Sequence, residues 1–160
     1  MRPARTLALI VTCALSGCAA AGAPAFFNPT SEPLGPYSQL GEANGFVFAS
    51  GVIAIAPDTG QLAAPNIEEQ TRQALANLDA LLAARGRTRS DVVKTTVFLR
   101  EPADMAAMNA VYAEFFKDHR PARTTVPGAD WGNPNILVEI EAIAVRRLGS
   151  GRRDPASPPE

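Results

Sequence analysis

Residues 120–147 read "RPARTTVPGADWGNPNILVEIEAIAVRR" and decide the fold, because the second half of this stretch alternates with the two-residue period of a β-strand. One side of that strand is wholly apolar and suits packing under helices; it consists of Ile136, Val138, Ile140, Ala142 and Ala144. The other side mixes aliphatic residues with two carboxylates, Glu139 and Glu141. Such a face is too apolar for open water and too charged for a sealed core. We therefore predict an oligomer interface that contains a polar pocket.

The segments before this strand predict one sheet and two helices. Residues 46–56, "FVFASGVIAIA", are rich in β-branched and aromatic residues and predict a strand pair bent at Ser50 and Gly51. Asn66 and Glu69 form a capping box that begins an amphipathic helix. The remaining elements are a strand over 91–100, a helix from Pro102 and a short strand over 122–127. The order β-β-α-β-α-β-β predicts an α+β domain in which two helices cover one face of a single sheet.

The two ends of the chain lie outside this domain, which we place at residues 34–147. Residues 1–17 have two arginines, a short apolar run and small residues, which is typical of a secretory signal peptide. The sequence "LSGC" that ends at Cys18 resembles a bacterial lipobox and predicts a lipid-anchored linker over 18–33. Residues 148–160 are predicted to be a disordered tail. We therefore expect a lipoprotein of the bacterial cell envelope, anchored to a membrane and facing the periplasm or the exterior.

The composition narrows the chemistry and the partners. The 160 residues carry 15 basic and 16 acidic side chains, so there is no basic excess for binding nucleic acid. The two cysteines are Cys13, which leaves with the signal peptide, and Cys18, which the lipid occupies. The mature protein would then have no free thiol, which excludes disulfides, thiolate catalysis and cysteine metal sites.

Two charged residues are the candidate chemical groups. On the strand over 122–127, Arg123 and Thr125 point the same way and are able to line one site together. The planar fork of arginine suits a carboxylate, although a structural salt bridge with Glu139 or Glu141 is the alternative. Glu139 in an apolar setting is expected to have a raised pKa and to exchange protons, or else to be a half-buried carboxylate that arginine neutralises. Spacing alone does not decide between these interpretations.

Six blocks of the sequence, in this order, resemble the RidA (YjgF/YER057c/UK114) family: "LGPYSQ" at 34–39, "FASGVI" at 48–53, "DVVKTTVFL" at 91–99, "MNAVYAEFF" at 108–116, "PAR" at 121–123 and "VEIEAIA" at 138–144. The resemblance implies a chorismate-mutase-like α+β fold and a homotrimer whose three sheets form a barrel, with sites in the clefts between subunits. It also implies hydrolysis of reactive enamines and imines, of the 2-iminopropanoate and 2-iminobutanoate type, to 2-oxo acids and ammonia. That reaction needs no metal and no cofactor.

The resemblance implies a role for each matching residue. Arg123 would bind the carboxylate of a small-molecule substrate, and Glu139 would manage the water and the proton. The other substrate-binding positions are Tyr37, which would close over the substrate, Ser50 and Gly51, which would line the pocket, and Asn109, which would hydrogen-bond within it.

The sequence departs from the family pattern at three places, of which one is a shorter link between the second helix and Arg123. Thr124 and Thr125 follow the arginine where the family favours a small residue and then often cysteine, and Trp131 stands where an aliphatic residue is usual. These changes would reshape the pocket. The alternative function is therefore a non-catalytic envelope lipoprotein on the same trimer, which binds a small molecule or protects proteins.

Overall fold

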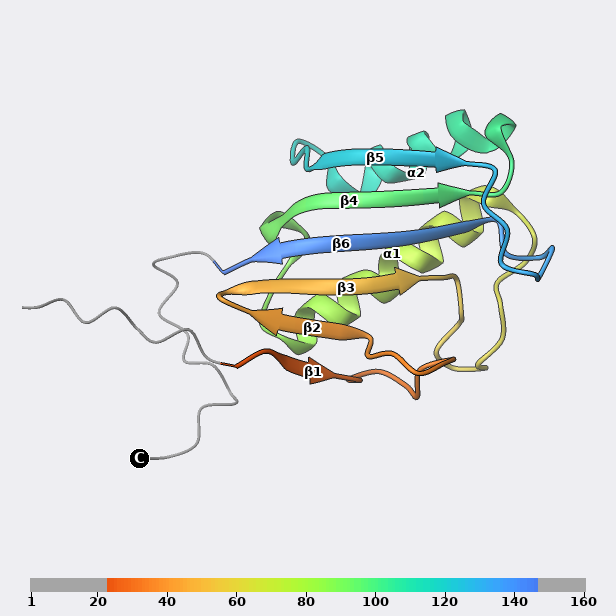
Figure 1. The fold of residues 1–160 in the computed structure, drawn as a ribbon. Coiled ribbons are helices and arrows are strands. Elements are labelled where there is room, and N and C mark those ends of the chain that lie inside the picture. Colours follow the sequence, from red (N-terminus) through yellow and green to blue (C-terminus); the bar gives the residue numbers. More distant parts are fainter. Residues whose placement is uncertain (1–22, 147–160) are drawn as a thin grey trace, which may run out of the picture.

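The computed structural model describes residues 23–146 (Figure 1). The elements in chain order are β1 (Ala25–Phe27), β2 (Leu40–Ala43), β3 (Phe46–Val52), α1 (Ile67–Ala84), η1 (Arg89–Asp91), β4 (Val92–Leu99), η2 (Pro102–Asp104), α2 (Met105–Phe116), β5 (Ala122–Pro127) and β6 (Val138–Val145). The predicted signal peptide, the lipidation at Cys18 and the tail over 148–160 lie outside the described residues. No helix within residues 23–146 is long and apolar enough to cross a membrane.

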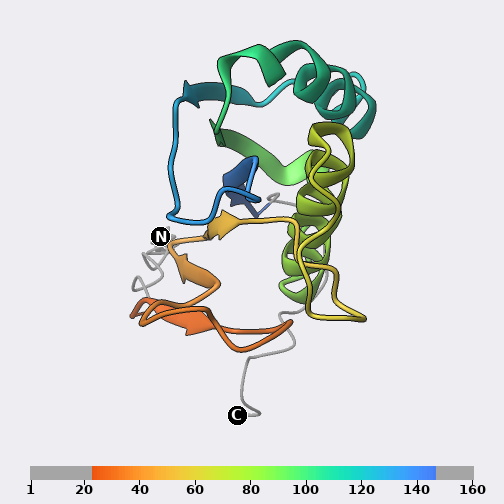
Figure 2. The same ribbon diagram turned by 90° about the vertical axis from the view of Figure 1, so that its right-hand side faces the viewer.

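All six strands belong to one sheet, in the order β1-β2-β3-β6-β4-β5. Every neighbouring pair is antiparallel except β4 and β5, which are parallel because α2 carries the chain back between them. Both α-helices cover the same face of the sheet, as the side view shows (Figure 2). The predicted α+β architecture, a single sheet covered on one face by two helices, is thus confirmed.

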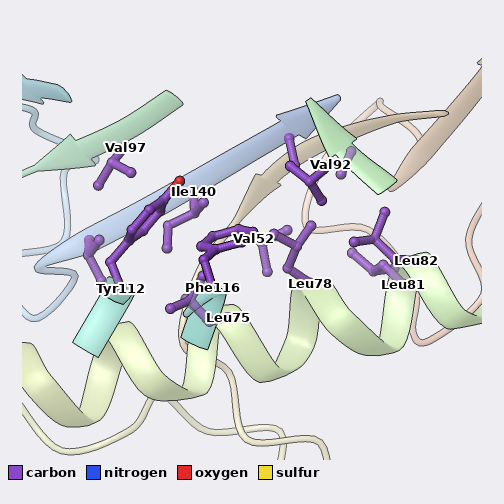
Figure 3. Close-up of a cluster of buried hydrophobic side chains, with 14 of the residues drawn as sticks. Val52, Leu75, Leu78, Leu81, Leu82, Val92, Val97, Tyr112, Phe116 and Ile140 are labelled. Atoms are coloured by element: carbon purple, nitrogen blue, oxygen red, sulfur yellow. The ribbon is translucent and has the colours of Figure 1, made fainter. Parts of the chain in front are cut away.

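The central strand β6 separates a buried face of the sheet from an open one. Val138, Ile140, Ala142 and Ala144 are at most 2% exposed, whereas the residues between them are only partly buried. The buried set packs against α1 and α2, whose side chains Leu75, Leu78, Leu82, Tyr112 and Phe116 fill the space above the sheet (Figure 3). The alternation predicted for this strand is confirmed.

Helix α1 begins at the predicted Asn66 cap, although the Asn66 N–H donates to Ala64 and not to Glu69, so only half of the predicted capping box forms. The helix is joined to β6 by one buried amide. The Asn66 side chain accepts a hydrogen bond of 3.0 Å from the backbone N–H of Glu69. The fully buried Gln70 donates to the backbone oxygen of Asn135 at 2.7 Å and accepts from the N–H of Leu137 at 3.0 Å. These two bonds fix the segment that enters β6.

The prediction that residues 46–56 form a pair of strands is wrong. This segment contains only β3, and the antiparallel partner of β3 is β2. Asn44 and Gly45 join the two strands with φ values of 52° and 80°, the left-handed geometry that a tight hairpin requires. The predicted bend is present, because the pairing of β3 with β6 shifts register between Ala49 and Val52.

The ordered sheet also reaches into the segment interpreted as a linker. Residues 25–27 form β1 and pair with β2. The guanidinium of Arg85 lies 3.9 Å from the centre of the Phe27 ring and donates to Glu42 of β2 at 2.9 Å. A three-residue strand carries too little periodicity to be recognised, and it is these contacts with Arg85 and β2 that stabilise it.

Candidate active site

Arg123 lies on the edge strand β5 and faces the helices. It pairs with Thr95 of β4, and paired residues project to the same side of a sheet. Thr95 is fully buried, and its hydroxyl lies 2.7 Å from the hydroxyl of Tyr112 on α2. The Arg123 guanidinium lies 4.7 Å from the centre of the Tyr112 ring, a cation–π contact that orients it. Because Arg123 is exposed and makes no salt bridge within residues 23–146, it is able to bind an anion.

Two buried polar atoms lie on the elements that hold Arg123. Thr125 pairs with the buried Val97 and so shares the face of Arg123, as predicted. Thr125 Oγ1 and Asn109 Oδ1 are buried without a hydrogen-bond partner in the described structure. Asn109 stands one helical turn before Tyr112 on α2. Buried polar atoms usually have partners, so these two atoms are candidate contacts for a bound molecule. We call Arg123, Thr125 and Asn109 the arginine half-site.

Glu139 lies on the opposite face of the sheet. It alternates with the buried Val138 and Ile140 on β6, so its side chain projects to the open face. Partial burial raises the pKa of Glu139 above its ordinary value, and repulsion from Glu141 adds to the rise, whereas a hydrogen bond from Trp131 opposes it. The alternative predicted for both residues, a structural salt bridge between Arg123 and Glu139 within one chain, is therefore excluded.

Glu139 occupies a space that Gly51 leaves open. A Cβ atom at position 51 would approach within 2.9 Å of Glu139 Cγ and still closer to its carboxyl group. The register shift that places Gly51 here is the bend in β3. The absence of a side chain at Gly51 thus lets the carboxylate lie against the backbone of the neighbouring strand.

A cavity of about 310 Å³ lies next to Gly51. Its lining includes Tyr37, Ser50 and Gly51, together with residues of α1 and of the segment over 30–34. The Ser50 hydroxyl donates to the backbone oxygen of Ser38 at 2.7 Å, whereas Tyr37 is 45% exposed at the rim. The aliphatic part of the lining includes Ile53, Ile55, Ala76, Ala80 and Leu81. Glu139 does not line this cavity, whose α1 residues belong to the helix-covered side of the sheet, and Gly51 is the residue that lies next to both. We call Tyr37, Ser50, Gly51 and Glu139 the glutamate half-site.

Arg123 and Glu139 thus lie on different faces of the sheet, with Thr125 on the face of Arg123 and Gly51 beside Glu139. One chain does not bring Arg123 and Glu139 together. Sequence reasoning assigned Tyr112 to the core only, although its position three residues after Asn109 was the available sign that it reaches the same site. Within residues 23–146, no group of three or more His, Cys, Asp or Glu side chains is placed to hold a metal ion.

Comparison with known proteins identifies the family. The family model described as Endoribonuclease L-PSP matches residues 29–146. The 2-iminobutanoate/2-iminopropanoate deaminase of Salmonella typhimurium is 42% identical over 117 residues, which cover 71% of this chain and 90% of that protein. A solved member of the Rid protein family from Yersinia pestis has a TM-score of 0.72 and 42% identity, over 78% of this chain and 100% of that chain. Escherichia coli TdcF, solved with bound serine, has a TM-score of 0.67 and 36% identity, over 74% of this chain and 94% of that chain. The fold, the order of the motifs and these matches together show that the chain belongs to the RidA family.

Proposed function

We propose that this protein hydrolyses reactive enamine and imine intermediates of the 2-iminopropanoate and 2-iminobutanoate type to 2-oxo acids and ammonia. The observation that carries the proposal is the pair of half-sites, an unpaired exposed arginine and a carboxylate of raised pKa. Both occupy the positions that match the family motifs. The name of the relative from Salmonella typhimurium and the serine bound to TdcF add support, because both indicate small carboxylate-bearing molecules.

The proposed site forms between two copies of the chain. The arginine half-site of one subunit would meet the glutamate half-site of the next, since a single chain keeps Arg123 and Glu139 on different faces. The open face supports such an assembly because it exposes large apolar side chains: Phe46 is 42% exposed and Phe48 is 44% exposed. A closed homotrimer would cover this face around one symmetry axis.

The reaction needs a bound anion, a placed water and a proton carrier. Arg123 would hold the substrate carboxylate through two parallel hydrogen bonds, and Thr125 and Asn109 would bond neighbouring polar atoms. Water adds to the carbon of the protonated imine while the Glu139 carboxylate takes one of its protons. Glu139 then returns that proton to the nitrogen, and the C–N bond breaks. The new hydroxyl group gives its proton to the departing ammonia, so the products are a 2-oxo acid and ammonium. Protons and charge balance without an added co-reactant.

The direct test follows the decay of an imine made in place. An amino-acid oxidase acting on alanine releases 2-iminopropanoate, and a carbonyl trap such as semicarbazide reports how much imine survives. We expect the purified domain to reduce the trapped imine in proportion to its concentration. A decay rate equal to that in buffer would refute the deaminase proposal.

Mixed oligomers test where the site forms. Chains carrying Arg123→Ala would each retain a complete glutamate half-site, and chains carrying Glu139→Gln would retain a complete arginine half-site. Alone, each variant should keep about a hundredth of the wild-type rate or less, whereas randomly mixed trimers should recover about a quarter of it, because one interface in four combines two intact halves. No recovery in mixtures shown by mass spectrometry to be hybrid would contradict a shared site.

A glycine substitution tests the position of Glu139. Gly51→Ala places a methyl group where the carboxyl group lies, so Glu139 must turn away and the deaminase rate should fall about tenfold to a hundredfold. The fold should survive, because Gly51 does not need a positive φ and a flexible carboxylate is able to move. Gly41→Ala is the matched control, since its added methyl group would meet only Phe26 at an ordinary 3.5 Å. Equal rates for both variants would show that the carboxylate position is unimportant.

RNA cleavage is a second activity to measure, because the family model is described as an endoribonuclease. The half-sites give it little support. The glutamate half-site presents Glu139 with Glu141 nearby on the same strand face, which repels a phosphate backbone. A labelled single-stranded RNA incubated with the same preparation should remain intact under the conditions that consume the imine.

A further inference from the structure

The cavity next to Gly51 is much larger than the proposed imines need. It has a volume of about 310 Å³ and is lined by α1, by the end of β3 and by the segment over 30–34. A cavity of about 150 Å³ is already large enough to hold benzene. The methyl side chain of 2-iminopropanoate and the ethyl side chain of 2-iminobutanoate would therefore leave most of this space empty.

The cavity adjoins the glutamate half-site. Its lining includes Tyr37, Ser50 and Gly51, which are three of the positions that the resemblance assigns to the substrate. The pairing of β3 with β6 ends at Val52, and Glu139 is the second residue of β6, so Gly51 and Glu139 lie at the end of the sheet. A molecule that lies across this end is able to contact Glu139 on the open face and to reach the cavity on the helix-covered face.

The polar side chains that α1 contributes to the lining bind the protein itself. Asn77 Nδ2 donates to the backbone oxygens of Ile53 and Ile55 at 3.0 Å and 2.8 Å. Asn77 Oδ1 accepts from Gln73 Nε2 at 2.8 Å. Because these groups already have partners, the surface that remains for a ligand on this side is mainly aliphatic.

The segment over 30–34 is held in place by Gln39. Gln39 Oε1 accepts from the backbone N–H of Thr30 at 3.2 Å and from the Thr30 hydroxyl at 3.1 Å, and its Nε2 donates to Ser31 Oγ at 3.1 Å. The backbone oxygen of Gln39 accepts from the N–H of Ser50 at 3.0 Å. These bonds tie the segment to β3, so the cavity is formed before a ligand binds.

The charge at the cavity selects against an acidic ligand group. Within the described part of the chain, Glu32 is the one charged residue of the lining, and no lysine, arginine or histidine lines it. A carboxylate in the cavity would therefore lie without a counter-charge, which is costly. The carboxylate of a substrate is left to Arg123 of the neighbouring subunit, and the cavity would receive the side chain.

We propose that this cavity binds the side chain of the substrate, and that the preferred substrates are imines with an apolar side chain larger than ethyl, such as 2-imino-4-methylpentanoate, the imine of leucine. This inference rests on the proposed function for the reaction, but not for the class of side chain. One methylene group in an apolar enzyme pocket changes kcat/KM by about 10-fold to 200-fold. The leucine imine should therefore exceed 2-iminopropanoate in kcat/KM by at least about tenfold.

The first test reads the cavity without using activity. Pyruvate and 4-methyl-2-oxopentanoate are the products of the two imines and differ only in the side chain. Titration calorimetry of the assembled protein should show that 4-methyl-2-oxopentanoate binds at least about tenfold more tightly than pyruvate. Equal dissociation constants, or no measurable binding of 4-methyl-2-oxopentanoate, would overturn the inference even if the protein is an active deaminase. A protein that shows this preference but hydrolyses neither imine would refute the proposed function and leave the ligand class of the cavity established.

The second test fills the cavity. An amino-acid oxidase acting on leucine or on alanine supplies the two imines, and the readout is the ratio of their kcat/KM values. Ala76→Phe and Ala80→Phe each add a ring at the lining and should lower this ratio about tenfold. Ala83→Phe is the matched control, because Ala83 is exposed on the same helix and does not line the cavity, so the ratio should stay unchanged. A ratio that neither filling variant lowers, or that Ala83→Phe lowers equally, would show that the cavity does not hold the side chain.

Discussion

Arg123→Ala is expected to lower kcat/KM for 2-iminopropanoate by on the order of a hundredfold to a thousandfold, because truncating one partner of a close charge pair costs about 2–5 kcal/mol. The loss should appear mainly as a higher KM if the arginine only binds, and in kcat as well if it also orients the imine carbon. Steady-state rates over a range of oxidase-generated imine concentrations separate the two effects.

Two further variants define what Arg123 contributes. Arg123→Lys keeps the positive charge but loses the planar fork, so it should recover only part of the rate. Arg72→Ala removes another exposed arginine, on α1, and should leave the rate unchanged. Because Arg123 is exposed on an edge strand, its free energy of unfolding should change by less than about 0.5 kcal/mol upon substitution by alanine. Wild-type kinetics for Arg123→Ala would remove the basis of the proposed site.

Glu139→Gln is expected to lower kcat on the order of a hundredfold or more with a nearly unchanged KM, because the amide cannot accept or return a proton but leaves Arg123 in place. The wild-type rate should fall as the pH drops through the raised pKa of Glu139, since the protonated acid is no longer a base. This acidic limb therefore lies above the ordinary value of 4.5. The residual activity of Glu139→Gln should lack that limb.

The stability of the same variant should change in the opposite direction to its activity. A carboxyl group whose pKa is raised by folding binds its proton more tightly in the native state, so the native state loses stability as the pH rises from 4.5 through the raised value. Glu139→Gln removes this loss and should be at least as stable as wild type at pH 7. Urea unfolding of the wild type and of Glu139→Gln, at pH 4 and at pH 7, measures this difference in the free energy of unfolding. A variant that is less stable than wild type at pH 7 would indicate that Glu139 serves the fold instead of the chemistry.

The strongly periodic elements of this protein could be predicted from sequence. The alternation over Ile136–Val145, the cap at Asn66 and the strand over 91–100 are local patterns, and their outcome depends on neighbours within a few residues. The strand pair predicted for residues 46–56 was wrong because a continuous apolar run does not show where a strand ends. The Asn44-Gly45 turn was the clearer hairpin signal, and it lies before the apolar run.

Some features of the candidate site could also be predicted from local sequence patterns, and others could not. The pattern of β5 placed Arg123 and Thr125 on one side, and the pattern of β6 placed Glu139 opposite the apolar face. Their motifs identified them as candidates. No local pattern revealed Tyr112 beneath Arg123 or the space beside Gly51 that Glu139 occupies, because each of these contacts joins elements far apart in the chain.

The sequence by itself therefore determined the family, the kinds of element and the chemical groups, since periodicity and motif are properties of neighbouring residues. Only the tertiary structure decided that Arg123 and Glu139 lie on opposite faces of one sheet. The side of a strand that becomes buried depends on where the helices pack. The pairing register decides the rest: Arg123 lies opposite Thr95 of β4, which faces the helices, whereas Glu139 lies opposite Phe98, which faces away from them.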